Sequence, residues 1–361
     1  MFVIVLLTTL LITAVLWFYS PSDFVDEFLK KYDIGWYGMI KCGDGNQHYC
    51  KYDVRGNITQ PTRIASISKA LTSLTVLSII QKGSHSLTLE STISSIFPNL
   101  KCVDGRVLGI TIDQLLNHTG GWDTREGFDI CEGSGKCYHI SDPQYDLAKI
   151  VKSKYELVDY ILQTQKLNHN PGSVYAYSNF GYNVLGRILE IVCGKSYETI
   201  VFDEILTESG IARTEAWVST RSDKPHPQEV IYDDKTDDLE FSIYKDTPYK
   251  VPLSYGSSYD LGLMDSHGGW VMSVETLVKV IPLAMKITCD IRDFKGNHIY
   301  GMRTYTNNKR RMFIHNGALT NGVFGIFSFS NDGRMFVMVV NHFDGKMMEV
   351  EDNVRKEVFQ I

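Results

Sequence analysis

The stretch Arg63-Ile64-Ala65-Ser66-Ile67-Ser68-Lys69-Ala70 begins an apolar run that ends at Lys82-Gly83. We expect a helix that is buried rather than amphipathic, because apolar residues stand at Ile67, Ala70, Leu71, Leu74, Val76, Leu77, Ile79 and Ile80. Glycine is a typical residue just after the end of a helix. Ser66 and Lys69 are three residues apart, a spacing that places a hydroxyl and an amine on one helix face within reach of each other.

A lysine beside a serine in a protein core indicates nucleophilic catalysis. Burial disfavours the ammonium form of Lys69, and the positive end of the helix dipole disfavours it further. A neutral amine could accept the proton of Ser66 and so activate its oxygen. The pattern S-x-x-K fixes only two positions and occurs by chance in many chains, so it needs support from other motifs.

The composition is that of an ordinary globular protein. The chain has 361 residues, enough for one large domain or two modest ones, of which 43% are hydrophobic and 22% charged. The net charge of −6 argues against nucleic acid as a partner, because phosphate binding needs a basic patch. No cysteine or histidine spacing is typical of zinc, and we expect neither a metal nor a cofactor.

The N-terminal segment is apolar, and residues 2–18 contain no charged side chain. Such a segment predicts a membrane anchor or a secretory signal, and the lack of a basic n-region or a small-x-small cleavage site favours an uncleaved anchor. We therefore expect residues 1–20 to be an anchor or signal segment. The expected localisation is the secretory pathway, either single-pass and membrane-anchored or secreted, with the membrane as a partner.

The cysteines are compatible with an oxidising compartment. Cys42 and Cys50 flank a Gly-Asp-Gly turn, and Cys131 and Cys137 flank a short glycine-rich segment. Each pair could close a short disulfide loop. The remaining cysteines, Cys102, Cys193 and Cys289, are left unassigned.

Strand patterns occur at both ends of the chain, and helical patterns lie between them. Residues 36–41 and 48–54 read as a hairpin near the N-terminus. An antiparallel meander before a last helix at 347–359 is predicted by β-rich runs at residues 299–305, 311–315, 323–330 and 334–343. We expect an α+β fold with one antiparallel sheet formed from both chain ends and flanked by helices, and an all-helical region inserted at roughly residues 85–290.

Two further segments carry polar groups suited to catalysis. Tyr177 and Asn179 are two residues apart in an expected extended or turn segment before a helix at 183–192, so their side chains point to the same side. A phenol and an amide there could polarise a serine and hold a substrate carbonyl, although a packed tyrosine in a turn also explains the pattern. In His315-Asn316-Gly317-Ala318, Gly317 permits close backbone approach to a ligand, and the amide of Ala318 could point at an oxyanion.

A sharp break in the chain follows two glycines in Leu115-Leu116-Asn117-His118-Thr119-Gly120-Gly121-Trp122. His118 in this segment is a candidate catalytic base. Because Ser66 already has Lys69 beside it, we expect His118 to hold a tight loop instead.

In their order and spacing, these motifs resemble the serine β-lactamase and penicillin-binding-protein-like hydrolases, in particular the class C, esterase and animal β-lactamase-like branch. The resemblance runs from about Trp36 to His342. It rests on Ser66-Ile67-Ser68-Lys69, Leu115 to Trp122, Pro171-Gly172 with Tyr177-Ser178-Asn179-Phe180-Gly181-Tyr182, Gly268-Gly269, and His315-Asn316-Gly317.

The resemblance implies roles for the motif residues. Ser66 would be the acylated nucleophile, Lys69 its proton acceptor, and Tyr177 a second acid/base group for the leaving group and the deacylating water. Asn179 would hold the carbonyl or amide side of the substrate, and the backbone amides of Ser66 and Ala318 would form the oxyanion hole. The implied fold is β-lactamase/transpeptidase-like, with a β-lactamase-related hydrolase domain at residues 21–361 and the site in the cleft between the sheet and the helical part.

One position departs from the family pattern. Members that act on β-lactams commonly carry Lys-Thr-Gly where this chain has His315-Asn316-Gly317, and a neutral or half-protonated His315 anchors a carboxylate less well than lysine. We therefore expect a serine hydrolase that is an esterase or peptidase, with small-molecule or peptide substrates. The alternatives are a genuine β-lactamase and a catalytically silent binding or scaffold protein that keeps the fold.

Overall fold

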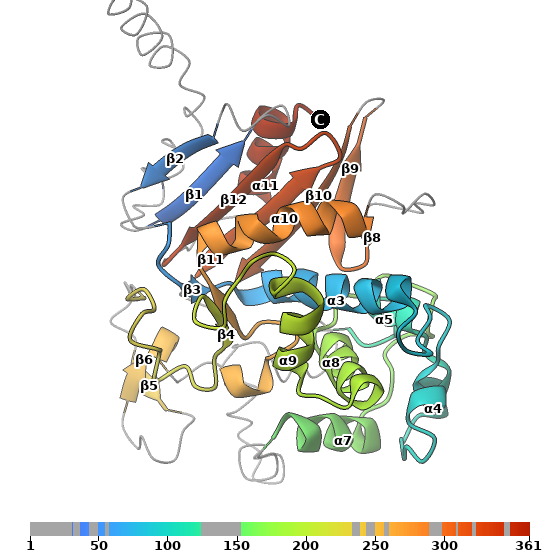
Figure 1. Cartoon of the computed structure of the whole chain (residues 1–361). Coiled ribbons are helices and arrows are strands. Elements are labelled where there is room, and N and C mark those ends of the chain that lie inside the picture. The colour runs from blue at the N-terminus through green and yellow to red at the C-terminus, as the bar shows by residue number, and fades with distance from the viewer. Residues whose placement is uncertain are drawn as a thin grey trace, which may run out of the picture.

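The computed structural model describes residues 31, 37–42, 50–54, 58–123, 153–232, 239–242, 250–255, 260–288, 298–307, 310–319, 323–342 and 347–361. A large antiparallel sheet with helices on both faces lies beside a region made mainly of helices (Figure 1). The α+β fold expected from the sequence is confirmed.

The large sheet joins the two ends of the chain. Its strand order is β2-β1-β12-β11-β10-β9-β8, and every neighbouring pair is antiparallel. The N-terminal hairpin is attached to the C-terminal meander because Tyr37 of β1 pairs with Val340 of β12. The strands are β1 (Tyr37–Cys42), β2 (Cys50–Val54), β8 (His298–Ile299), β9 (Met302–Thr306), β10 (Arg311–Ala318), β11 (Phe324–Ser330) and β12 (Met335–Val340).

Two small sheets lie outside the large one. Strands β3 (Thr62–Arg63), β7 (Trp270–Met272) and β4 (Ala216–Val218) form the first in the order β3-β7-β4. Strands β5 (Leu239–Phe241) and β6 (Lys250–Pro252) form the second.

The C-terminal strands differ from the sequence expectation at two places. The run 299–305 is split into β8 and β9 by Tyr300 and Gly301, whose φ angles of 47° and 78° suit a two-residue hairpin turn with both central residues left-handed. Strand β10 does not end at His315 but continues to Ala318, paired with β11 throughout.

Each face of the sheet has its own core. Alternate side chains of a strand point to opposite faces. Phe313 of β10 belongs to the core that contains α3 (Ser68–Lys82) and α10 (Val274–Thr288), whereas Ile314 belongs to the core under α11 (Met347–Val354). Residues 315 and 317 therefore face α3.

Helix α3 connects the sheet to the helical region. It packs against α10 on the sheet side and against α8 and α9 on the other (Figure 1). Every residue from Ser68 to Ile79 is buried, and Gly83 ends the helix in a left-handed conformation, as the sequence predicted. The other helices are α4 (Ile93–Ile96), α5 (Ile112–Leu116), α7 (Lys154–Thr164), α8 (Asn179–Cys193) and α9 (Tyr197–Val201), with short 3₁₀ or π helices at Ala65–Ile67, Gly105–Gly109, Phe202–Leu206, Leu253–Tyr255, Leu261–Leu263 and Arg355–Phe359.

The expected localisation is corrected by the structure. Within the described ranges, no helix combines the length and the apolar character needed to cross a bilayer, so the single-pass anchor is not supported. Residues 2–18, on which the secretory-pathway prediction depended, lie outside the described residues.

The described cysteines behave differently from one another. Cys42 is disulfide-bonded, and Cys50 faces it in the register of β1 and β2. Cys102 and Cys193 are free thiols. The second expected pair, Cys131 and Cys137, lies outside the described residues, as does Cys289.

Candidate active site

Ser66 lies in the 3₁₀ turn Ala65–Ile67, immediately before α3. Ala65 has a φ of 47°, a left-handed conformation that is uncommon for residues other than glycine and often marks functional sites. Both neighbours of Ser66 are buried, whereas Ser66 itself is partly exposed. The turn therefore presents the serine hydroxyl at the surface of an otherwise buried segment.

Lys69 follows one turn later and is fully buried at 0% exposure. Its Nζ lies 3.0 Å from Ser66 Oγ and donates a hydrogen bond to the backbone oxygen of His267 at 2.9 Å. The same Nζ lies 4.9 Å from the centre of the Tyr177 ring. A neutral amine has two N–H donors and one lone pair, so it can bind His267 O and still accept a proton from Ser66.

Tyr177 approaches the serine from the helical region. Its hydroxyl lies 2.9 Å from Ser66 Oγ, so the nucleophilic oxygen contacts both the amine and the phenol. The sequence predicted that these three side chains act together, and the structure brings all three into hydrogen-bond distance.

His118 fixes the segment that carries Tyr177. The backbone N–H of Ser178 donates to His118 Nδ1 at 3.1 Å, and the His118 and Tyr177 rings lie 4.7 Å apart between centroids at 33°. Burial, followed by the charge of Lys69, lowers the pKa of His118 well below 6.5, which keeps the imidazole neutral and able to accept. His118 therefore holds a tight loop, as expected.

Helix α8 begins at Asn179, four residues before the expected start at 183. Ser178 is the N-cap, because its side chain accepts a hydrogen bond from Gly181 N at 3.0 Å. Tyr177 thus precedes the helix, whereas Asn179 is buried in its first turn.

Gly317 brings β10 against the turn that contains Ser66. A Cβ at this position would overlap the backbone oxygen of Ile64 and would lie 3.1 Å from the backbone nitrogen of Ser66. The sequence predicted close approach to a ligand here, but the close approach is to the chain's own nucleophile turn. Only glycine fits this contact without moving the strand.

Ala318 presents its backbone amide away from β11. Leu319 N donates to Val323 O, on the side of β11. In an antiparallel pair, neighbouring residues point their N–H groups to opposite edges of the strand, so the amide of Ala318 points to the other edge. On the other edge, β9 pairs with β10 only from Arg311 to Ile314. The amides of Ser66 and Ala318 are close together because Ser66 N lies beside Gly317.

His315 lies two residues before Gly317 and so on the same face of β10. Its Nδ1 is 2.7 Å from the backbone oxygen of Asn316, and the residue is 6% exposed. Burial, with Lys69 as the next cause, lowers the pKa of His315 from 6.5 to about 3. His315 is therefore neutral at physiological pH and does not supply the permanent cation of a lysine at this position.

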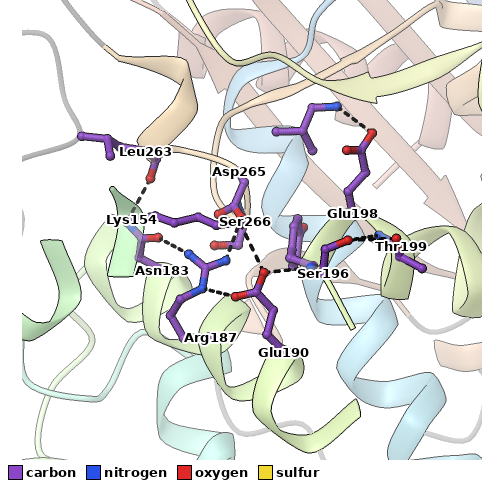
Figure 2. Close-up of polar contacts among 12 residues, drawn as sticks. Lys154, Asn183, Arg187, Glu190, Ser196, Glu198, Thr199, Leu263, Asp265 and Ser266 are labelled. Carbon is purple, nitrogen blue, oxygen red and sulfur yellow. Dashed lines mark hydrogen bonds and ion pairs between the residues drawn. The ribbon is translucent and has the colours of Figure 1, made fainter. Parts of the chain in front are cut away.

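Lys154, Arg187, Glu190 and Asp265 form a cluster of charged side chains that is largely buried, with Lys154 partly exposed (Figure 2). Asp265 Oδ2 lies 2.7 Å from Arg187 Nη2 and 2.5 Å from Lys154 Nζ, and Arg187 Nε lies 2.8 Å from Glu190 Oε2. Burial raises the pKa of the Asp265 carboxyl, but the two cations outweigh burial and leave it below the usual value. The carboxylate is therefore ionised.

This cluster supports the backbone that holds α3. Asp265 Oδ1 accepts from Ser266 N at 2.7 Å, and the next two carbonyls bind α3, Ser266 O to Thr72 Oγ1 at 2.6 Å and His267 O to Lys69 Nζ. None of these charged residues was predicted from the sequence. The sequence feature that could have revealed the cluster is the pair Arg187 and Glu190, two charged residues inside an otherwise apolar helix pattern.

The fold and site match known proteins. The model of the Beta-lactamase family matches residues 23–358. The chain is 24% identical over 304 residues to Protein flp of Staphylococcus aureus, an overlap of 80% of this chain and 53% of that protein. The chain thus spans about half the length of this curated relative.

Solved structures share the fold at low sequence identity. A D-stereospecific amidohydrolase from Streptomyces sp. has a TM-score of 0.68 at 17% identity, covering 93% of this chain and 97% of that one. A penicillin binding protein from Bacillus halodurans has a TM-score of 0.65 at 16% identity, covering 91% of this chain and 98% of that one.

The chain therefore belongs to the Beta-lactamase family. The expectation of a β-lactamase-related serine hydrolase is confirmed at the level of the family, and the antiparallel sheet beside a helical part is the expected architecture.

Proposed function

We propose that this protein is a serine hydrolase that works through an acyl-enzyme on Ser66, with ester or amide bonds of small molecules or peptides as substrates. The observation that carries the proposal is the contact of Ser66 Oγ with both Lys69 Nζ at 3.0 Å and Tyr177 OH at 2.9 Å. A serine needs an adjacent base to become a nucleophile, and here two candidate groups lie within hydrogen-bond distance.

The proposed reaction has two stages. Ser66 Oγ attacks the substrate carbonyl and gives its proton to Lys69, while the amides of Ser66 and Ala318 stabilise the negative oxygen. Tyr177 then gives a proton to the leaving group, which departs and leaves the acyl-enzyme. Water attacks the ester carbonyl and gives a proton to the Tyr177 phenolate. The ester bond then breaks, Lys69 returns its proton to Ser66 Oγ, and the acid leaves. Asn179 holds the substrate amide or carbonyl.

An esterase or peptidase is preferred over a β-lactamase because of His315. A β-lactam carboxylate needs a cation or strong donors, and a buried imidazole whose pKa is about 3 is neutral. The solved D-stereospecific amidohydrolase, which shares the fold, supports amide chemistry as compatible with this architecture.

The test is covalent labelling with a fluorescent fluorophosphonate probe, which phosphonylates activated serines with loss of fluoride. We expect labelling of the wild-type protein at Ser66, located by peptide mass analysis, and none in Ser66→Ala. Ser94→Ala is the matched control, since Ser94 is an exposed serine on α4. If the wild-type protein is not labelled, or if Ser66→Ala is labelled equally, the proposed acyl-enzyme function of Ser66 is refuted.

A further inference from the structure

His315 lies on β10 two residues before Gly317, the point at which the strand meets the Ser66 turn. Strand β10 is held against the Ser66 turn at Gly317, and His315 lies on the same strand face one pleat earlier. Lys69, whose Nζ lies 3.0 Å from Ser66 Oγ, is also among the groups that lower the pKa of His315. His315 is therefore near enough to the Ser66 turn to be reached by a substrate bound there.

The hydrogen bond at Nδ1 fixes the tautomer of His315. A carbonyl oxygen can only accept, so the 2.7 Å contact between Nδ1 and Asn316 O requires the proton to be on Nδ1. In a neutral imidazole the other nitrogen, Nε2, then carries a lone pair and accepts. Within the described residues, Nε2 has no hydrogen-bond partner.

The surroundings keep the ring neutral. Burial is the largest cause of its low pKa, and the charged or titratable groups of the described residues that lower it further are Lys69, Arg303 and His298. The carboxylate of Glu351 lies under the opposite face of β10, where it accepts from Asn316 Nδ2 at 2.7 Å and binds Arg303 at 2.5 Å. The ring therefore presents an acceptor rather than a cation to the site.

The flank beside His315 is aromatic. Tyr175, which is 42% exposed, stacks on His298 with ring centroids 4.2 Å apart at 27°. Burial lowers the pKa of His298 below its usual value, so this wall also favours an uncharged ring. A carboxylate placed here would meet a lone pair and two aromatic rings.

We propose that Nε2 of His315 selects substrates by accepting a hydrogen bond from them. The site then takes esters or amides that carry an N–H, ammonium or hydroxyl donor next to β10 and disfavours those that carry a carboxylate there. This inference rests on the proposed acyl-enzyme function, and it names the substrate class for that site.

The test compares two sets of phenyl esters, one substituted on the acyl group and one on the phenol. Each set carries an aminomethyl, hydroxymethyl, ethyl or carboxylate group at the same position. We expect kcat/KM of the donor-bearing ester to exceed that of the carboxylate ester by at least about tenfold in one set, the usual effect of matching a buried hydrogen-bonding group. The ethyl ester is the reference: a higher kcat/KM for the donor-bearing esters shows that donors are favoured, and a lower kcat/KM for the carboxylate ester shows that carboxylates are disfavoured.

Two variants assign the preference to His315. His315→Phe keeps a ring without nitrogen, so the ratio of kcat/KM for the donor-bearing ester to kcat/KM for the carboxylate ester should fall toward one. His315→Lys places a donor and a cation at the position, so the ratio should reverse in favour of the carboxylate. Because each ratio compares two substrates on the same protein, partial loss of folded protein in a variant leaves the ratio unchanged.

The outcomes separate the two proposals. No labelling of wild-type Ser66 by the fluorophosphonate probe overturns the acyl-enzyme function and this inference with it. Labelling of wild-type Ser66 with equal kcat/KM for donor and carboxylate esters in both sets, or with a preference that persists in His315→Phe, overturns the role of His315 alone.

Discussion

Replacing Gly317 with alanine would push β10 away from the turn that carries Ser66. The added Cβ would overlap the backbone oxygen of Ile64, and backbone atoms cannot rotate aside as a side chain can. To restore van der Waals contact, the strand and the turn must separate by about 1 Å. Such overpacking costs about 1–3 kcal/mol, and the loss of glycine's freedom in the unfolded chain offsets up to about 1 kcal/mol of it.

The effect on activity should exceed the effect on stability. A shift of about 1 Å between a nucleophile and the groups around it can slow a reaction by about 100-fold. We therefore expect Gly317→Ala to unfold at slightly lower urea concentration and to label with the fluorophosphonate probe far more slowly than wild type.

The control is Gly105→Ala, where an added Cβ meets nothing within 4 Å. It should match the wild-type protein in both urea unfolding and labelling rate. If Gly317→Ala labels at the wild-type rate, then the contact between β10 and the nucleophile turn does not set the geometry of the site, and the reasoning fails.

Three further predictions concern charge and hydrogen bonding around the site. Asp265→Asn should destabilise the fold by about 3 kcal/mol because the buried Arg187 and the partly buried Lys154 lose the carboxylate that they share and keep only Glu190. The measurement is urea unfolding, with Asp203→Asn in an exposed ion pair as a control that should change stability less. The folded protein lowers the pKa of Asp265 below its usual value of 3.8, so the ionised carboxylate stabilises the fold above about pH 4. This contribution is lost as the pH falls through the folded-state pKa. The difference in unfolding free energy between wild type and Asp265→Asn should therefore become smaller in acid. The substrate preference set by His315 should be constant from pH 5 to 8 because its pKa is about 3, whereas a change near pH 6.5 would show an ordinary histidine. His118→Phe keeps an aromatic ring but leaves the buried N–H of Ser178 without its acceptor, so labelling should slow about tenfold, and an unchanged rate would remove His118 as a positioning residue.

The main reacting groups of the site could be predicted because they depend on short spacings and on the order of motifs along the chain. Ser66 and Lys69 are one helical turn apart, so their contact follows from helix geometry. Tyr177 and the β10 segment were singled out by residue type and local spacing, but only the order of the motifs connected them with Ser66. Their contact with Ser66 requires the long-range fold, which the sequence supplied only through the resemblance.

The missed features depend on backbone groups and on remote segments. The oxygen of His267 that binds Lys69 belongs to the main chain, so no residue type marks it. Lys154, Arg187 and Asp265 come from three separate segments and meet only in the folded protein. The start of α8 was placed too late because Ser178, its cap, stands in a segment that reads as a turn.

The reacting groups come from both halves of the fold, and this makes activity sensitive to how those halves pack. Lys69 is on α3, Tyr177 comes from the helical region, and Gly317 comes from the sheet. Another contact across the same junction places Gly301, in the β8–β9 turn, so close to the Tyr182 hydroxyl that a Cβ at 301 would overlap it. Since Tyr182 OH also lies 2.9 Å from Ser73 Oγ on α3, a side chain at 301 would press on the helix that positions Lys69. Substitutions far from Ser66 at this junction should therefore reduce catalysis before they unfold the protein.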